Sequence, residues 1–147
     1  MADFDWDPKK EALNLSKHGV DFTTASLIWD GFVSERLDDR REYREMRFVA
    51  FGIAETRVLA AVYTPRGGVR RIISARMLIG EREGSMMKKS HAVAARTRTD
   101  WARVDALTDE EIEAAAQDDP DAAPIVDEEW FRTATLVMPK AKEQISI

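Results

Sequence analysis

One histidine at the end of a predicted helix and several arginines near predicted strands are the side chains best suited to chemistry. They stand in three short motifs: Lys17-His18-Gly19, Glu45-Met46-Arg47 and Arg71-Ile-Ile-Ser-Ala-Arg76. A histidine or a glutamate can move protons, and an arginine can hold two oxygens of one phosphate. Cleavage of RNA without a metal needs these functions. The ribose 2′-hydroxyl attacks the neighbouring phosphate, and the protein moves the protons and stabilises the developing charge.

Each motif also has a purely structural explanation. A histidine in the last turn of a helix interacts favourably with the helix dipole, and a Glu45–Arg47 pair can be an ordinary surface ion pair. Arginines between apolar residues are typical of a strand with one solvated face. Arg71 and Arg76 are five residues apart, so in an unbroken strand they point to opposite faces. They can serve one site only if the strand bulges or ends before Arg76.

Composition excludes several classes of site. The 147 residues contain no cysteine, and the two histidines, His18 and His91, are far apart, so we expect no metal site and no cofactor. No phosphate-binding loop, dinucleotide fingerprint or nucleophile elbow is present. The acidic N-terminus lacks an apolar leader, and the longest apolar runs are far shorter than the roughly 20 residues of a membrane span. We therefore expect a soluble, cytoplasmic protein.

The net charge of −5 is unevenly distributed. Residues 1–83 hold fourteen Lys and Arg against fourteen Asp and Glu, whereas residues 84–147 hold eight against thirteen. Within the second part, residues 100–131 carry twelve acids and a single base, while residues 57–76 carry five arginines and no acid. Such segments either attract each other or form two separate solvated faces.

The first part predicts a small α+β unit. Asp7-Pro8 and Gly19 bound a first helix, and Asp21 or Thr23 caps a second helix that ends at Asp30-Gly31. Strand-like runs follow at 32–37, 46–54, 57–64 and 69–75, the last three joined by short turns. This order predicts two N-terminal helices followed by an antiparallel meander.

The acidic part predicts an extended, mainly helical segment without a core of its own. Thr108 to Glu111 forms a capping box for a helix through Gln117, and Asp127 can cap a second helix that ends before Pro139. Its scattered apolar side chains are typical of anchors that bind another surface, and the first part is the nearest one. The residues expected to make these contacts are Trp101, Leu107, Glu111, Ile112, Trp130 and Phe131.

Residues 3–83 resemble the BrnT toxin family. The resemblance lies in Phe4–Lys10, Asn14–Phe22 and Arg71–Arg76, and the Glu45-x-Arg47 strand start fits as well. The family is similar in fold to RelE/ParE-type ribonuclease toxins and blocks translation by cleaving RNA. The resemblance implies a catalytic set of His18, Glu45, Arg47, Arg71 and Arg76. It also implies an RNA-binding set, in which we include Arg70: Lys9, Lys10, Lys17 and Arg70.

The second part resembles the N-terminal part of the BrnA antitoxin, over residues 98–112 and 118–121. In that family a ribbon–helix–helix DNA-binding unit follows, and its strand starts with a stretch like residues 142–147. The resemblance implies an antitoxin segment that is truncated before this unit, so we do not expect DNA binding by this chain.

Three segments are therefore expected: a toxin domain at 1–83, a junction at 84–99 and a toxin-binding segment at 100–147. Gly84-Ser85-Met86-Met87 fits either an engineered fusion or a natural linker. The predicted function is a type II toxin–antitoxin pair in one chain, with an inhibited ribonuclease and RNA as its substrate. The acidic segment can dock in cis or onto a second copy, and a homodimer is compatible with the sequence. A DNA-binding autoregulator and a non-catalytic interaction module are the alternatives.

Overall fold

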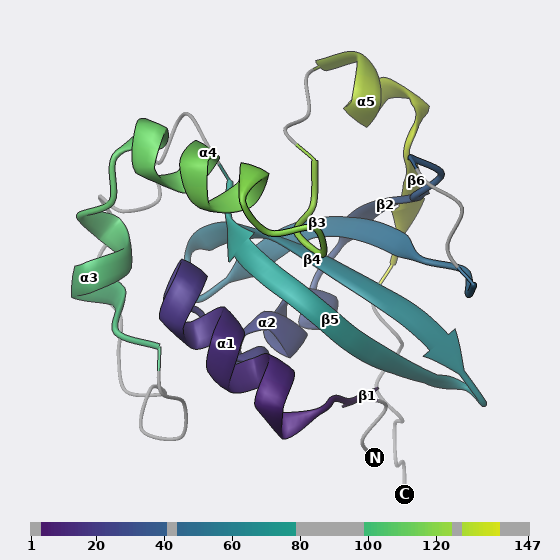
Figure 1. The fold of residues 1–147 in the computed structure, drawn as a ribbon. Helices are drawn as coiled ribbons and strands as arrows, with labels where there is room; N and C mark the ends of the chain where they lie inside the picture. The colour runs from purple at the N-terminus through teal and green to yellow at the C-terminus, as the bar shows by residue number, and fades with distance from the viewer. Residues whose placement is uncertain (1–3, 41–43, 79–98, 125–127, 139–147) are drawn as a thin grey trace, which may run out of the picture.

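Six strands form one mixed sheet across the centre of this computed structural model (Figure 1). Their bounds are β1 Phe4–Asp5, β2 Val33–Leu37, β3 Phe48–Ala54, β4 Arg57–Arg66, β5 Val69–Met77 and β6 Thr135–Val137. Their order is β1-β5-β4-β3-β2-β6, with β1 parallel to β5 and the other neighbours antiparallel. The α+β class is confirmed. The predicted antiparallel meander is present as β2 to β5. The sheet as a whole is mixed, because the short parallel strand β1 lies at one edge and β6, from the acidic part, lies at the other.

The structure describes residues 4–40, 44–78, 99–124 and 128–138. Below, residues 4–78 are called the front part and residues 99–138 the tail. The expected junction, apart from Thr99, and the expected ribbon start at 142–147 lie outside the described residues. Among the described residues, no helix combines the length and the apolar character needed to cross a membrane.

The first helix, α1 Pro8–His18, begins and ends where the sequence predicts. The Asp7 carboxylate accepts a hydrogen bond from the Lys9 backbone N–H at 2.9 Å. Gly19 has a φ of +80°, which a residue with a side chain rarely adopts, and its N–H closes the helix onto the Leu15 carbonyl. The second predicted helix divides into α2 Phe22–Ser26, capped by Asp21, and a 3-10 turn, η1 Leu27–Asp30.

The tail contains three helices, α3 Trp101–Asp105, α4 Asp109–Gln117 and α5 Glu128–Thr133. The predicted capping box of α4 is confirmed, with Thr108 and Glu111 bonded reciprocally. The helix predicted to run toward Pro139 is too long, because α5 ends at Thr133 and the chain then pairs with β2 as β6. Neither α3 nor β6 was predicted.

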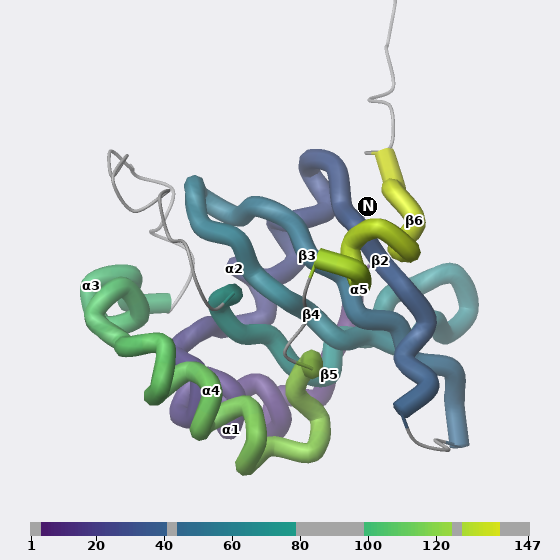
Figure 2. Tube along the Cα trace, turned by 90° about the horizontal axis from the view of Figure 1, so that it is seen from above, coloured from purple at the N-terminus to yellow at the C-terminus, as the bar shows by residue number. Residues whose placement is uncertain are grey.

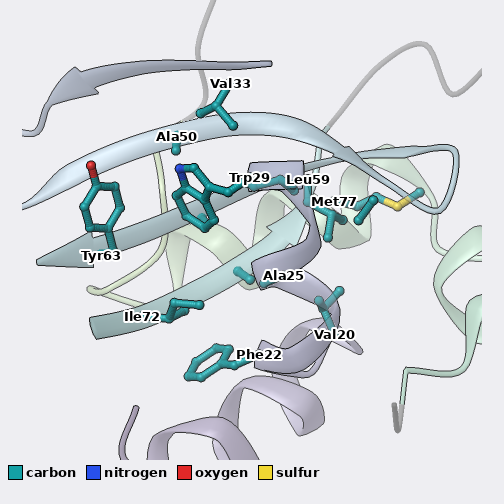
Figure 3. Close-up of a cluster of buried hydrophobic side chains, with 14 of the residues drawn as sticks. Val20, Phe22, Ala25, Trp29, Val33, Ala50, Leu59, Tyr63, Ile72 and Met77 are labelled. Carbon is teal, nitrogen blue, oxygen red and sulfur yellow. The ribbon is translucent and has the colours of Figure 1, made fainter. Parts of the chain in front are cut away.

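Apolar side chains cover both faces of the sheet. The first face packs against α1, α2 and η1 around Phe22, Trp29 and Leu59, as Figure 3 shows. Val104 and Ile112 of the tail join this cluster. The second face carries Val49, Phe51, Ala60, Val62 and Ile73, and Ala123 and Trp130 of the tail pack against it. The tail thus starts beside α1 and continues over the opposite face of the sheet (Figure 2).

Candidate active site

Helix α1 brings two lysines and the histidine to one edge of the sheet. Lys10, Asn14 and Lys17 are spaced by four and three residues and therefore lie on one side of the helix. The buried Asn14 amide fixes this side against β5. Its Nδ2 donates to the carbonyls of Val20 and Ala75 at 2.9 and 2.8 Å, and its Oδ1 accepts from the Ala75 N–H at 3.1 Å. The helix cannot rotate about its axis without breaking these bonds.

A β-bulge in β5 turns Arg71 and Arg76 to the same face of the sheet. Tyr63 pairs with Ile72 while the adjacent Val62 pairs with Ser74, so Ile73 is the extra residue. Arg71 consequently pairs with Thr64 and Arg76 with Ala60, two positions of β4 that share one face. The sequence required such a bulge, or an earlier strand end, for both arginines to serve one site. Without it, their five-residue spacing would separate them.

Two carboxylates of the tail lie among the cations of this surface. Asp121 is 2.6 Å from Lys10 Nζ and 3.1 Å from a guanidinium nitrogen of Arg47. Asp119 Oδ2 accepts a hydrogen bond from His18 Nε2 at 2.9 Å, and Asp119 Oδ1 lies 4.0 Å from Lys17 Nζ. Burial alone would raise the pKa of Asp119, but the His18 hydrogen bond, the Asp121 N–H and the charges of His18 and Lys17 together lower it. Asp119 is therefore an ionised carboxylate at neutral pH.

Backbone carbonyls of the same segment bind two arginines. Arg76 donates to the Pro124 carbonyl at 2.6 Å and to the Ala123 carbonyl at 3.3 and 3.4 Å. Arg40 donates to the Ala122 carbonyl at 3.1 Å. Arg76 is 1% exposed, and burial lowers its pKa to about 10, with a further contribution from the charge of Arg40. The guanidinium stays charged at neutral pH and is fully covered by the tail.

A hollow of about 200 Å³ lies beside the docked carboxylates. Glu45, Arg47, Arg66, Arg71 and Lys10 line it, and Thr64 and Ile73 are among its other walls. Glu45 accepts from Arg47 Nε at 3.3 Å and is 3.6 Å from Arg66. Arg71 is held by Asp5 of β1 at 2.7 and 3.0 Å. Glu45 therefore shares this open hollow with four cations, Lys10, Arg47, Arg66 and Arg71, at a place where a phosphate could bind.

Two of the expected RNA-binding residues lie apart from this surface. Lys9 is exposed on α1. Among the described residues, its side chain contacts neither the tail carboxylates nor the cations around them. Arg70 precedes Arg71 and so points to the opposite face of the sheet, where its guanidinium is 5.0 Å from the Trp29 ring and 5.5 Å from the Tyr63 ring. Burial, together with Glu35, raises the pKa of Tyr63. The Tyr63 phenol is therefore neutral at neutral pH, and the Arg70 guanidinium lies over its ring.

Five of the six expected tail contacts pack on the front part. The Trp101 indole N–H donates to Glu55 at 2.7 Å. Leu107 and Ile112 pack in the apolar cluster on the first face of the sheet. Trp130 and Phe131 each place their rings 5.1 Å from that of Phe51. Glu111 is exposed, and its carboxylate accepts from the Thr108 N–H of its own helix. Glu111 therefore serves in the capping box of α4, which the sequence had also predicted, and not as a contact with the front part.

The sequence reasoning missed four residues of the surface: Arg40, Arg103, Asp119 and Asp121. Arg103 donates to the Leu15 and Ser16 carbonyls at the C-terminal end of α1, at 3.3 and 3.1 Å. The sequence did offer a signal for Arg103, since it is the single base in an acidic stretch. A cation is favourable at the negative, C-terminal end of a helix dipole. For the aspartates the signal was weaker, since nothing in the spacing distinguishes them from the acids of α4. Arg40 gave no signal at all.

The described residues hold no group of three or more His, Asp or Glu side chains arranged to bind a metal ion. A search of curated proteins finds no match to this chain. A family model described as "Ribonuclease toxin, BrnT, of type II toxin-antitoxin system" matches residues 6–80, which is 75 of the 147 residues. The matched range contains all the cations discussed above except Arg103.

Proposed function

Because the chain belongs to the BrnT family of ribonuclease toxins of type II toxin–antitoxin systems, we propose that its front part is a metal-independent endoribonuclease that inhibits translation. We propose further that the tail is a BrnA-like antitoxin segment that keeps this enzyme inactive within the same chain. The fold relationship to RelE/ParE-type toxins belongs to the same proposal. The observation that carries it is the insertion of Asp119 and Asp121 among Lys10, His18 and Arg47.

The proposed reaction is an attack of a ribose 2′-oxygen on the adjacent phosphorus, which forms a 2′,3′-cyclic phosphate and releases the 5′-oxygen. Glu45 takes the proton of the attacking hydroxyl, since its carboxylate lines the open hollow. His18 returns a proton to the leaving oxygen. Lys10, Arg47 and Arg71 hold the phosphate oxygens and stabilise the charge of the transition state.

The tail would inhibit by occupying the positions of RNA oxygens. A carboxylate has the charge and hydrogen-bond acceptors that a phosphate presents to lysine and arginine. The Ala123 and Pro124 carbonyls occupy the donors of Arg76 in the same way. Because the tail belongs to the same chain, its effective concentration is in the millimolar range, so each contact can be weak while the site stays closed.

A direct test compares RNA cleavage by the intact chain with cleavage by the full-length double variant Asp119→Asn/Asp121→Asn, in the presence of EDTA. We expect no cleavage by the intact chain and cleavage by the double variant, which should also inhibit cell-free translation. Adding Glu45→Gln to the double variant should lower the rate by about 10²- to 10⁴-fold. Asp118→Asn is the matched control, because Asp118 is exposed and its described hydrogen bond uses only its backbone N–H.

The assignment is wrong if the double variant opens, as judged by protease sensitivity of the tail, and still cleaves no RNA. A requirement for a divalent ion would refute the metal-independent mechanism. Inactivity of the opened chain together with tight binding of the separate tail peptide would favour the interaction module instead.

A further inference from the structure

Resting on the ribonuclease function proposed above, we propose that Phe51 is a stacking platform for a base of the RNA substrate. In the closed chain, Trp130 and Phe131 of the tail cover this platform, next to the buried Arg76. Such a platform would position single-stranded RNA, which neither the family match nor the catalytic groups specify.

The register of three neighbouring strands places Phe51 in one row with Arg76. Phe51 of β3 pairs with Ala60 of β4, and Ala60 pairs with Arg76 of β5. Paired residues of antiparallel strands point to the same face, so a ring, a methyl group and a guanidinium stand in one row across the sheet. Neighbouring strands are about 4.8 Å apart, so the small Ala60 leaves a shallow gap between the cation and the ring.

The tail crosses this row with matching chemistry. Its carbonyls at Ala123 and Pro124 accept from Arg76, and its Trp130 ring then lies edge-on to Phe51 at 5.1 Å. Phe131 contacts the same ring, also at 5.1 Å. The tail thus presents a hydrogen-bond acceptor to Arg76 and an aromatic ring to Phe51. A nucleotide would present the same two groups, with its phosphate as the acceptor and its base as the ring. Single-stranded nucleic acids are typically bound by a track of cations with aromatic side chains beside it.

The surroundings of Phe51 fit a base better than a second polar group. Val49 and Val62 flank it on the second face, and among the described residues the tail supplies what covers that face. Once the tail leaves, an apolar surface lies beside the cations that the tail had contacted, Arg76, Arg47 and Lys10. A base can bury its ring on such a surface while its phosphate stays on the cations. Every base has an aromatic face, so this contact adds affinity with little sequence preference.

The experiment uses the full-length Asp119→Asn/Asp121→Asn chain and an RNA oligonucleotide that is 2′-O-methylated throughout, so that no 2′-hydroxyl can attack. One position carries 2-aminopurine, whose fluorescence falls when it stacks on an aromatic ring. We expect Phe51→Leu to weaken binding by about 5- to 150-fold, the range of one stacked base, and to abolish the quenching. Phe51→Tyr should retain both, and Phe32→Leu, at an aromatic residue 59% exposed elsewhere, is the matched control.

The design separates two kinds of failure. If the double variant binds and cleaves RNA but Phe51→Leu behaves like Phe32→Leu, the platform is refuted while the ribonuclease assignment stands. If the opened chain neither binds nor cleaves RNA, both proposals are wrong. Phe51→Leu also removes a partner of the tail, which would favour opening and strengthen RNA binding, so a loss of affinity cannot arise from altered docking. Thermal unfolding of each variant checks that the sheet is intact.

Discussion

Replacing Asp121 with asparagine removes one negative charge from the contact between the tail and the front part, with little change in shape. The lost partners are Lys10 Nζ at 2.6 Å and Arg47 at 3.1 Å. Hydrogen bonds to charged groups contribute about 1.5–3 kcal/mol each when they are shielded from water. The Lys10 side chain is 42% exposed and that of Asp121 27% exposed, and exposed ion pairs contribute only about 0–1 kcal/mol. We therefore expect the tail to lose about 1–2 kcal/mol of docking free energy.

Under the proposed inhibition by the tail, this loss of docking free energy increases the ribonuclease activity. While most molecules are closed, the cleavage rate is proportional to the small open fraction, and 1.4 kcal/mol changes that fraction tenfold. Asp121→Asn should consequently cleave RNA about 5- to 30-fold faster than the intact chain. The assay measures cleavage of a fluorogenic RNA, and hydrogen exchange of the α4 amides reports opening independently.

Asp118→Asn provides the comparison, because it makes the same change of charge three residues away at an exposed side chain. An equal increase in both variants would mean that the tail acts only through its overall negative charge. No increase in Asp121→Asn, despite faster exchange of α4, would refute the idea that the Asp121 contact blocks the site.

Three further outcomes follow from the packing and the charges. Asn14→Ala removes the amide that joins α1 to β5 and leaves buried backbone groups unpaired, so we expect about 3 kcal/mol lower stability in urea unfolding. Gly52→Ala would place a methyl group 2.9 Å from Ile28 Cβ in the core, and it should lower stability by about 1–3 kcal/mol and the melting temperature by several degrees. Because docking lowers the pKa of Asp119 below its ordinary 3.8, its stabilising contact with His18 should be fully present above that pH and lost as the pH falls further. The difference in melting temperature between the intact chain and Asp119→Asn should then vanish in acid.

Local signals in the sequence were sufficient for much of the fold. Asp7-Pro8 and Gly19 bound α1 through backbone capping, which acts within a few residues and is visible without tertiary structure. The capping box at Thr108 is of the same kind. The two hairpin turns, at 55–56 and 67–68, adopt positive φ values between long strands, as such tight connections require.

The missed features depend on contacts between distant segments. Strand β1 has two residues and β6 three, too few to show an alternating pattern, and each exists because a longer strand offers it an edge. The segment 118–124 has no regular structure, so its role follows from where the front part places its cations. Trp130 and Phe131 were predictable as anchors, because large aromatic side chains in a segment without a core need another surface.

The bulge at Ile73 also determines whether the Arg71–Arg76 motif keeps its geometry when it is grafted onto a strand of another protein. In a regular strand, two side chains that share a face are separated by an even number of positions, so the geometry of Arg71 and Arg76 corresponds to a spacing of four, the separation of their partners Thr64 and Ala60. Grafting the six-residue motif onto an unbulged strand would therefore place one guanidinium on the wrong side. Conversely, deleting Ile73 in this protein would straighten the strand and leave a spacing of four, which keeps both guanidinium groups on one face. The extra residue is as much a part of the motif as the arginines themselves.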